Sequence, residues 1–274
     1  MKIVTLLENT SHRPDLAAAR GLSLYVEAAG RKVLFDMGPD ASFLDNARSL
    51  GIDLAAVDTA VLSHGHSDHG GGLAAFCAVN AKASIYLRQE ALGAYYAVLP
   101  GQEPNYIGLP ETGALAERFV FTGDQETLGD GLTLFSSVED DKSLRTVAPK
   151  LQERTGEGFR PDGFAHEQHL LVEEGGKAAL LAGCGHLGIV NTLREAERRL
   201  GRRPDVVFGG FHLFELKPGA PEAEALLRAT AEELRQGSTI YYTGHCTGDW
   251  AYERLKEALG DRLRPMDCGA SAEL

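Results

Sequence analysis

Apolar residues in the first forty positions recur with the spacing of β-strands. Turns separate three short apolar runs, at residues 2–9, 22–28 and 33–38. In the second run Leu22, Leu24 and Val26 alternate with other residues, and alternate side chains of a strand point to the same face. We therefore expect the chain to begin as a sheet that is covered on one face.

Strands alternate with helices from residue 42 onward. The pattern predicts strands over residues 58–66 and 83–88, and helices over residues 42–51, 71–80 and 91–99. The strand over residues 58–66 is apolar until it reaches the histidines at its carboxyl end. The chain then turns toward the helix over residues 71–80, so these histidines lie between a buried strand and a helix.

Residues 99–165 have no clear period because glycine, proline and charged residues dominate them. Two short strands are predicted there, over residues 118–123 and 132–137. Residues 139–164 are predicted to form a long loop or flap, since unstructured connections of this length are usually functional or mobile. The alternative, a surface excursion without a role, stays open.

The last third of the chain repeats the alternation of strands and helices. A hairpin with its turn at residues 174–177 is predicted over residues 168–186. Strands follow over residues 205–213 and 239–248, and helices over residues 191–201, 221–237 and 249–260. Three apolar strands in this part each finish with a histidine within two residues of a glycine. No linker-like break in composition occurs, so we expect one domain over residues 1–274, made of two similar halves.

Composition and charge narrow the class of protein. In a chain of 274 residues, 43% hydrophobic residues are enough for a buried core. The net charge of −12 provides no basic field for a nucleic acid backbone. The amino terminus has no apolar stretch of the length found in a signal peptide, and no segment has the roughly 20 apolar residues of a membrane span. We therefore expect a cytoplasmic protein without a membrane partner. The four cysteines are far apart in sequence, which favours thiols over disulfides.

Residues 62–72, LSHGHSDHGGG, contain the strongest candidate for a metal site. His64 and His66 are two positions apart, so in extended chain both rings leave the backbone on the same side and can bind one ion. Asp68 and His69 follow as the chain turns toward a helix and can reach a second ion. Imidazole and carboxylate ligands suit Zn²⁺, with Mn²⁺ or Fe²⁺ as alternatives. Histidines that merely cap a surface helix are the weaker interpretation of so dense a ligand set.

The motif HxHxDH after an apolar strand, preceded by VLFDMG, resembles the metallo-β-lactamase superfamily. The resemblance covers essentially the whole chain and implies a mixed α/β fold, a four-layer αββα sandwich that holds one or two metal ions between its sheets. Three further stretches are similar to a branch of stand-alone metal-dependent hydrolases that includes proteins named dihydropterin ribofuranosyl-aminobenzene phosphate synthases: LLAGCGHLGIVNT, VVFGGFHL and YYTGHCTG.

The resemblance also implies a set of ligands for two zinc ions. It assigns two residues of the motif and one later histidine to each ion: His64, His66 and His186 to the first, and Asp68, His69 and His245 to the second. His212 is a ligand, a neighbour of a ligand or a substrate contact. Cys184 stands where the superfamily usually has a bridging aspartate, so the bridge is a thiolate, a water or another residue.

Two other polar positions bear on the site. Asp36 is predicted to accept a hydrogen bond from a ligand histidine and so fix its tautomer; the alternative is a simple turn residue. His166 and His169 are three apart at the start of a strand, where alternation sends them to opposite faces, so they are weak candidates for a ligand pair.

The predicted chemistry is hydrolysis. Two cations that share a water lower its pKa toward about 7, which makes hydroxide available to attack a carbonyl or phosphoryl centre. Asp68 is assigned to orient this nucleophile, and His212 to donate a hydrogen bond to substrate or leaving group. The sequence contains no GxSxG motif that would indicate a serine nucleophile.

The expected substrate is a small metabolite, phosphorylated or pterin-like. Aromatic residues could stack on a planar ring, and basic residues could pair with a phosphate: Tyr95, Tyr96, Tyr106, Phe159 and Phe164, and Arg145, Lys150 and Arg160. Two alternatives stay open, a non-enzymatic sensor or binding protein and a nuclease-type phosphodiesterase. For assembly, we expect a homodimer, the commonest oligomer.

Overall fold

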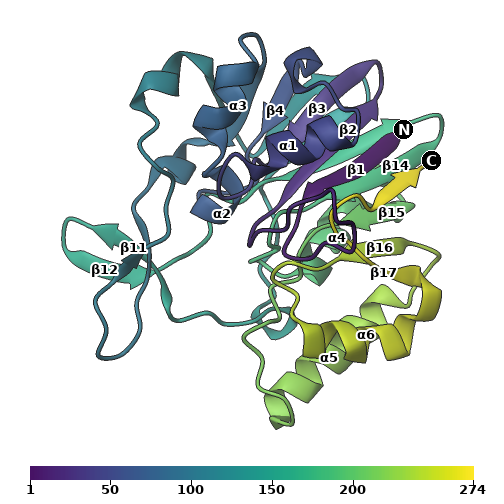
Figure 1. Cartoon of the computed structure of the whole chain (residues 1–274). Coiled ribbons are helices and arrows are strands. Elements are labelled where there is room, and N and C mark those ends of the chain that lie inside the picture. Colours follow the sequence, from purple (N-terminus) through teal and green to yellow (C-terminus); the bar gives the residue numbers. More distant parts are fainter. The chain divides into compact units, whose positions relative to one another are not determined.

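The computed structural model describes residues 1–274, and its internal contacts divide the chain into two compact units. Unit 1 contains Met1–Gly123, Ala148–Gln168 and Asp267–Glu273, and unit 2 contains Asp124–Val147, His169–Met266 and Leu274. Each unit has one seven-stranded mixed sheet with helices, which confirms the expected mixed α/β class (Figure 1). The single domain over residues 1–274 stays a prediction.

The large sheet of unit 1 has antiparallel strands at one side and parallel strands at the other. Its order is β18 (Ser271–Glu273), β1 (Lys2–Leu7), β2 (Ser23–Ala28), β3 (Arg31–Phe35), β4 (Thr59–Val61), β5 (Ser84–Arg88) and β8 (Phe119–Thr122). Pairing is antiparallel from β18 to β3 and parallel from β3 to β8. The last strand, β18, therefore lies beside the first.

Two helices cover one face of this sheet. Phe43 of α1 (Ser42–Ser49) and Phe76 of α3 (Leu73–Val79) belong to one buried cluster with Leu34 and Tyr25 from the strands. Shorter elements complete the region: η1 (Leu54–Ala56), α2 (Ser67–Gly70) and η3 (Gly113–Arg118). The helices predicted over residues 42–51 and 71–80 are confirmed, within one or two residues at each end.

The expectation that the first sheet is covered on one face is wrong. In β2, Tyr25 is 2% exposed although it points to the opposite side from Leu24 and Val26, which are fully buried. Tyr25 packs into the cluster under the helices, and its hydroxyl donates a hydrogen bond of 2.6 Å to Glu27. The polar end of the tyrosine is thus satisfied while its ring is buried, which simple apolar and polar alternation does not reveal.

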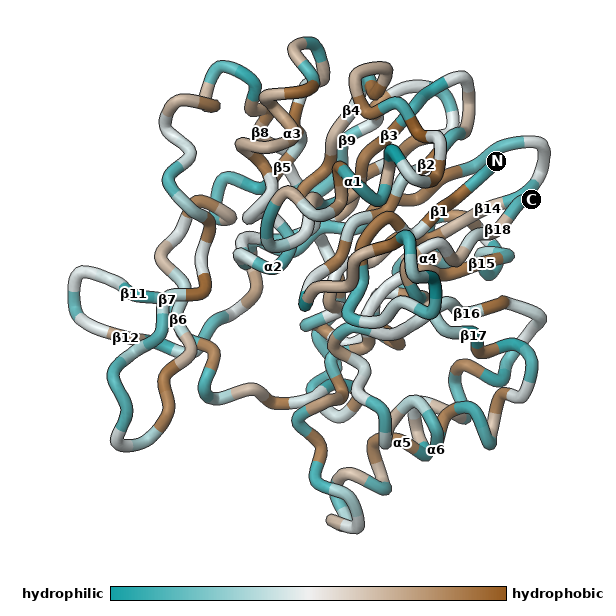
Figure 2. The backbone as a smooth tube through the Cα atoms, in the orientation of Figure 1, coloured by the Kyte–Doolittle hydropathy of each residue, from teal (hydrophilic) through white to brown (hydrophobic).

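A second, four-stranded sheet in unit 1 corrects two predictions. Its order is β12 (Gly158–Pro161), β11 (Leu151–Thr155), β6 (Tyr95–Ala97) and β7 (Asn105–Tyr106). The helix predicted over residues 91–99 is wrong, because the short helix η2 (Gln89–Leu92) ends before Gly93 and the chain then forms strand β6. Residues 139–164 contain the hairpin β11–β12, whose mostly hydrophilic side chains give no apolar period; they are mostly half-buried in β11 and exposed in β12 (Figure 2).

The sheet of unit 2 also joins antiparallel and parallel strands. Its order is β17 (Leu263–Pro265), β16 (Ile240–Thr243), β15 (Val206–Phe208), β14 (Lys177–Leu181), β13 (His169–Glu174), β10 (Leu132–Phe135) and β9 (Gln125–Gly129). Pairing is parallel from β14 to β17 and antiparallel on the other side. The predicted hairpin β13–β14 is confirmed.

Three helices pack on one face of this sheet: α4 (Ile189–Leu200), α5 (Pro221–Leu234) and α6 (Asp249–Leu259). Leu193, Leu227 and Leu255, one from each helix, share a buried cluster with Val207 and Tyr241 of the strands. Two short turns of helix, η4 (Lys142–Leu144) and η5 (Gly260–Arg262), complete the unit. All three helices were predicted, whereas β15 and β16 end several residues earlier than expected. None of the helices has both the length and the hydropathy that crossing a membrane requires.

Gly72, the residue before α3, provides a test of packing in unit 1. A Cβ atom at this position would lie 2.2 Å from the Met37 carbonyl oxygen and 2.7 Å from the ring of Phe43. We expect Gly72→Ala to lower the free energy of unfolding by about 1–3 kcal/mol or more, because the backbone must move. Chemical denaturation measures this change. Gly156→Ala is the control, because its Cβ would meet nothing within 4 Å, and equal destabilisation of both variants would contradict the packing described.

Candidate metal centre

The histidines of the HxHxDH motif lie close together in unit 1. β4 ends at Val61, and α2 begins immediately after His66, whose backbone is extended. The ring centroid of His64 lies 4.7 Å from that of His66 and 4.1 Å from that of His69. All three side chains are buried, whereas Asp68, on α2, is half-buried. The motif thus places several polar side chains where burial requires compensating partners.

A buried carboxylate orients the rings of His64 and His69. Asp36 Oδ2 lies 2.7 Å from His69 Nδ1 and accepts a hydrogen bond of 2.7 Å from the Ser63 hydroxyl. Because this hydroxyl has one proton and gives it to Asp36, His64 Nδ1 must donate to Ser63 Oγ, 2.8 Å away. Both rings carry their proton on Nδ1, and a ring in this tautomer binds metal through Nε2. The hydrogen bond predicted for Asp36 is present.

A second polar group lies beside His66. Asp162 Oδ2 is 3.7 Å from His66 Nε2 and 3.0 Å from His166 Nε2, and these three residues could together hold a metal ion. His166 Nδ1 accepts a hydrogen bond of 2.9 Å from the Gly65 N–H, so its proton is on Nε2 and is donated to Asp162. Both ring nitrogens of His166 are therefore engaged, and the ring positions Asp162 beside His66. His169 lies in unit 2, at the first residue of β13.

Sequence reasoning did not find Asp162 and gave His166 little weight. The segment that carries them is tied to the motif by backbone contacts: Gln168 N–H donates to Ser63 O across 2.7 Å, and Gln168 Nε2 to Leu62 O across 2.8 Å. These contacts join positions about a hundred residues apart, which no local pattern reveals. The only sequence signal was a second histidine-rich stretch, AHEQH.

Burial and charge shift the pKa values around His66 in opposite directions. Burial, the largest effect, lowers the pKa of His66. Burial would raise the pKa of Asp162, but hydrogen bonding with His166 and the neighbouring His66 outweighs it and holds this pKa well below its usual range. Burial also raises the pKa of Tyr95, whose ring lies 4.1 Å from that of His166. Asp162 is therefore an anion and the tyrosine a neutral phenol at neutral pH.

Unit 2 contains a second set of potential ligands. Cys184 and His186 follow β14, His212 follows β15, and His245 and Cys246 follow β16. The donor atoms of Cys184, His186 and His212 lie within 4.8 Å of one another, as do those of Cys184, His245 and Cys246. Sequence analysis named four of these residues and missed Cys246. None of the four cysteines of the chain forms a disulfide, as predicted.

Backbone contacts between the segments after β15 and β16 position these donors. Thr247 Oγ1 accepts a hydrogen bond of 3.1 Å from the Phe211 N–H, and the Cys246 carbonyl accepts one of 3.0 Å from the Leu213 N–H. His212 lies between these two donors in the chain. Its place relative to the Cys246 segment is therefore fixed from both sides.

Backbone strain marks three of the predicted site residues. Asp36, His212 and His245 have φ values of 61°, 48° and 48°, in the left-handed region that side chains disfavour. Only two other non-glycine residues, Ala29 and Phe164, have positive φ. Such strain persists where the surrounding structure enforces it, and it concentrates at functional sites.

The titratable groups of unit 2 affect one another strongly. Burial lowers the pKa of His212, but hydrogen bonding and charge from Cys246 and Glu215 outweigh it and raise the pKa to about 9. Burial raises the pKa of the Cys246 thiol, but hydrogen bonding with Cys184 and His212 and the charge of His245 lower it well below its usual range. A pKa of about 9 leaves the His212 ring protonated at neutral pH.

Three of the aromatic residues predicted to bind substrate cluster on the four-stranded sheet. The ring of Tyr96 lies 5.2 Å from the rings of both Tyr106 and Phe159, and the latter two are 47% and 41% exposed. Tyr95 and Phe164 are buried instead. An exposed cluster of this kind retains its ability to stack on a planar ligand.

Two of the three basic residues predicted to bind phosphate already have acidic partners. Arg145, in unit 2, makes two hydrogen bonds to Asp140, of 2.5 and 2.9 Å. Arg160, in unit 1, makes hydrogen bonds of 2.9 and 2.6 Å to Glu153. A cavity of about 370 Å³ is lined by Arg160, Glu153 and Asp162, so the hollow next to His66 is of mixed charge.

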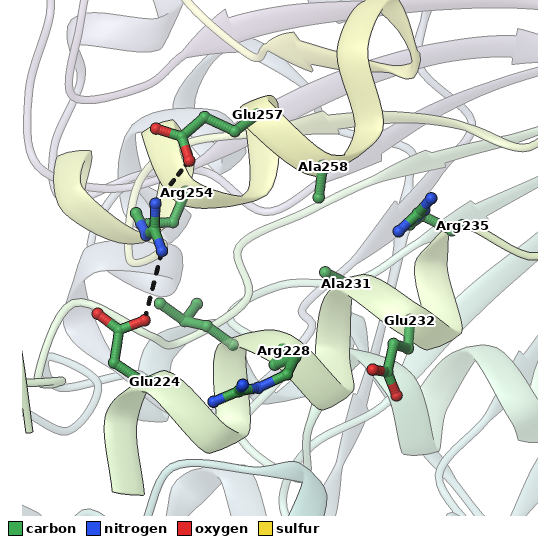
Figure 3. Close-up of a pocket in the computed structure, with 9 residues that line it drawn as sticks. Glu224, Arg228, Ala231, Glu232, Arg235, Arg254, Glu257 and Ala258 are labelled. Carbon is green, nitrogen blue, oxygen red and sulfur yellow. Dashed lines mark hydrogen bonds and ion pairs between the residues drawn. The ribbon is translucent and has the colours of Figure 1, made fainter. Parts of the chain in front are cut away.

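A further hollow of about 370 Å³ in unit 2 lies between α5 and α6 and contains none of the predicted ligands (Figure 3). Its charged residues are balanced: Glu224, Glu232, Glu257, Arg228, Arg235 and Arg254. Arg254 forms ion pairs with Glu224 and Glu257. With three acids against three bases, this hollow has no net charge to attract an ionic substrate.

The sequence places the chain in a known superfamily. Residues 18–245 match the sequence profile of the metallo-beta-lactamase superfamily, and the chain belongs to that superfamily. The crystal structure of Tm1679, described as a metal-dependent hydrolase of the beta-lactamase superfamily, is similar with a TM-score of 0.83 and 29% identity over 100% of this chain and 99% of that one. The predicted fold class is thereby confirmed.

Two other proteins are similar to this chain. A protein of Methanocaldococcus jannaschii named 7,8-dihydropterin-6-methyl-4-(beta-D-ribofuranosyl)-aminobenzene-5'-phosphate synthase is 25% identical over 98% of this chain and 95% of its own length. The structure of Zn²⁺-bound PqqB from Methylobacterium extorquens has a TM-score of 0.59 and 11% identity over the whole of both chains, which is a likeness of fold alone.

Proposed function

We propose that this protein is a metal-dependent hydrolase that binds two divalent metal ions and acts on a small metabolite. Zn²⁺ is the metal proposed, with Mn²⁺ and Fe²⁺ as alternatives. The observation that carries the proposal is the pair of hydrogen bonds that hold His64 and His69 with their protons on Nδ1, the tautomer in which a ring coordinates through Nε2. A buried carboxylate that serves two histidines in this way is the usual support of a metal site.

The donor residues fit divalent ions of the zinc type. We propose as ligands the six residues expected from the sequence: His64, His66, Asp68, His69, His186 and His245. Imidazole and carboxylate suit Zn²⁺, Mn²⁺ and Fe²⁺. A bound divalent ion lowers the pKa of a coordinated water and polarises the bond under attack. The protein's own contribution is to orient these ligands and to exclude bulk water through the burial of His64, His66, His69 and His186.

Two residues are proposed to act on the reacting groups. Asp68, half-buried on α2, orients the attacking water through its carboxylate. His212, with its pKa raised to about 9, is protonated at neutral pH and donates a hydrogen bond to the substrate or leaving group. A proton donor at this position stabilises the negative charge that develops during hydrolysis.

The substrate proposed is a phosphorylated or pterin-like metabolite. The Methanocaldococcus jannaschii relative is named for a phosphate compound that contains a dihydropterin. The exposed cluster of Tyr96, Tyr106 and Phe159 supplies rings on which a flat heterocycle could stack. We further propose a cytoplasmic protein, a homodimer, without nucleic acid or membrane partners.

The name of the same relative supports a second candidate, a synthase. Such an enzyme would use its ions and His212 to join two molecules rather than to cleave one with water. Product analysis separates the two: hydrolysis incorporates solvent oxygen into a product, whereas condensation of two substrates does not.

Elemental analysis, combined with activity assays, tests the proposed function. The purified protein, loaded under metal-replete conditions, is assayed on generic phosphodiester, ester and lactone substrates before and after chelation. We expect bound transition metal and an activity that chelation abolishes and added Zn²⁺ restores. Less than about one equivalent of metal per chain would contradict the proposal, since each ion is held by protein ligands. Bound metal without catalytic turnover would favour the alternative function of a non-enzymatic sensor or binding protein.

His212→Ala is expected to separate metal binding from rate. The variant should retain its metal but lose about 10²-fold or more in kcat, because the loss of one hydrogen-bond donor to developing charge has an effect of this order. Metal content and kcat are measured on the same preparation. Because the ring of His212 lies 4.2 Å from that of His186, a metal-free variant would instead identify His212 as a ligand.

A further inference from the structure

Cys184 is shared by two groups of potential metal ligands in unit 2. Its sulfur belongs to both groups whose donor atoms lie within 4.8 Å of one another, one with His186 and His212 and the other with His245 and Cys246. Both cysteines are buried, at 3% and 5% exposure. Two sulfur atoms and one imidazole nitrogen therefore lie within 4.8 Å of one another inside unit 2.

The neighbouring segments are built around the Cys246 sulfur. A Cβ atom on Gly210 would lie 2.3 Å from Cys246 Sγ, so only glycine at this position leaves room for the sulfur. The Cys246 Sγ lies 3.4 Å from the Cys184 carbonyl oxygen, to which it donates a hydrogen bond. His245, the residue before Cys246, has a strained φ of 48°, which turns the chain at this point. A buried cysteine that served only for packing would require neither a glycine beside its sulfur, such as Gly210, nor a strained backbone at the preceding residue, His245.

We propose that Cys184, Cys246 and His245 form a thiolate metal site, in which Cys246 is a ligand that the superfamily resemblance does not supply. This inference rests on the proposed function for its ions but concerns which residues hold one of them. On binding, each thiol loses its proton to solvent, and two thiolate–metal bonds form. Thiolate ligands favour Zn²⁺ or Co²⁺ over Mn²⁺, which prefers oxygen, so the site argues against Mn²⁺ among the candidate metals.

Cobalt spectroscopy on the full chain tests the site independently of activity. The reduced, metal-free protein is titrated with Co²⁺, and sulfur-to-cobalt charge-transfer absorption in the near ultraviolet is recorded. We expect this absorption in the wild type, and roughly half its intensity per bound ion in Cys246→Ser, in which one of two thiolates is lost. Cys77→Ser is the matched control, because Cys77 is a half-buried thiol on α3, far along the chain from these donors; it should retain the full intensity.

A second variant keeps every donor and moves one of them. Gly210→Ala pushes on Cys246 Sγ and should weaken or shift the same absorption, with circular dichroism used to verify the fold. Bound Co²⁺ without charge-transfer absorption, or full absorption in Cys246→Ser, would overturn the thiolate site even if the protein hydrolyses its substrate. Conversely, a cysteine-dependent band in a protein without hydrolytic activity would support the site and contradict the proposed function.

Discussion

Replacement of His66 by alanine is expected to remove bound metal and hydrolytic activity together. His66 is buried, its ring lies 4.7 Å from that of His64, and Asp162 lies 3.7 Å from its Nε2. Loss of a residue that only supports a ligand reduces metal affinity or activity by about 10–100-fold, so loss of a ligand should exceed about 100-fold. Elemental analysis and kcat/KM, measured on the same preparation, provide the test.

His12→Ala is the matched control for this prediction. The side chain of His12 is 80% exposed and pairs only with Asp267, at 3.3 Å. We expect its replacement to leave metal content and activity unchanged. A His66→Ala protein that kept its metal but lost activity would place His66 on the substrate instead of on the ion.

Asp36→Asn is expected to lower metal affinity by about 10–100-fold while the fold is retained. The asparagine can still accept the hydrogen bond of 2.7 Å from Ser63 N–H, but its amide group would face His69 Nδ1 with a donor. His69 must then move its proton to Nε2, the atom that should bind metal. Competition for Zn²⁺ with a chelator of known affinity measures the change. Asparagine also tolerates the φ of 61° at this position better than alanine does.

A surface aspartate serves as the control for this variant. Asp45 on α1 is 76% exposed and forms an ion pair with Arg48, so Asp45→Asn should change neither metal affinity nor activity. If Asp36→Asn retained wild-type affinity, the tautomer argument for His69 would be wrong, and Asp36 would be a structural residue of the turn after β3.

The sequence predicted those parts of the fold and of the candidate site that depend on residues close together in the chain. The HxHxDH motif, the helices of unit 2 and the strand that leads to His64 were all predicted from residues near one another in the chain. The hairpin β11–β12 was not, because its side chains are mostly half-buried in β11 and exposed in β12, so no buried apolar face develops. The period of apolar residues reports burial, so a solvated hairpin lacks that signal.

The missed parts of the site depend on contacts between distant residues. Asp162 reaches His66 through a hairpin and a set of hydrogen bonds that only the folded chain forms. The positive φ values of Asp36 and His212 likewise depend on surrounding structure and have no local signature, since neither residue is glycine. Cys246 was not predicted as a ligand, because a single cysteine beside a histidine does not match the spacing of any known metal-binding motif.

The pairing of β18 with β1 has a consequence for folding during synthesis. Lys2 pairs with Glu273, so during synthesis β1 lacks this partner until a strand far later in the chain has been made. Until those residues emerge, one edge of β1 exposes unpaired backbone N–H and C=O groups, which can pair with other nascent chains. A chain truncated just before β18 would therefore keep every predicted metal ligand but have an open, aggregation-prone edge at β1.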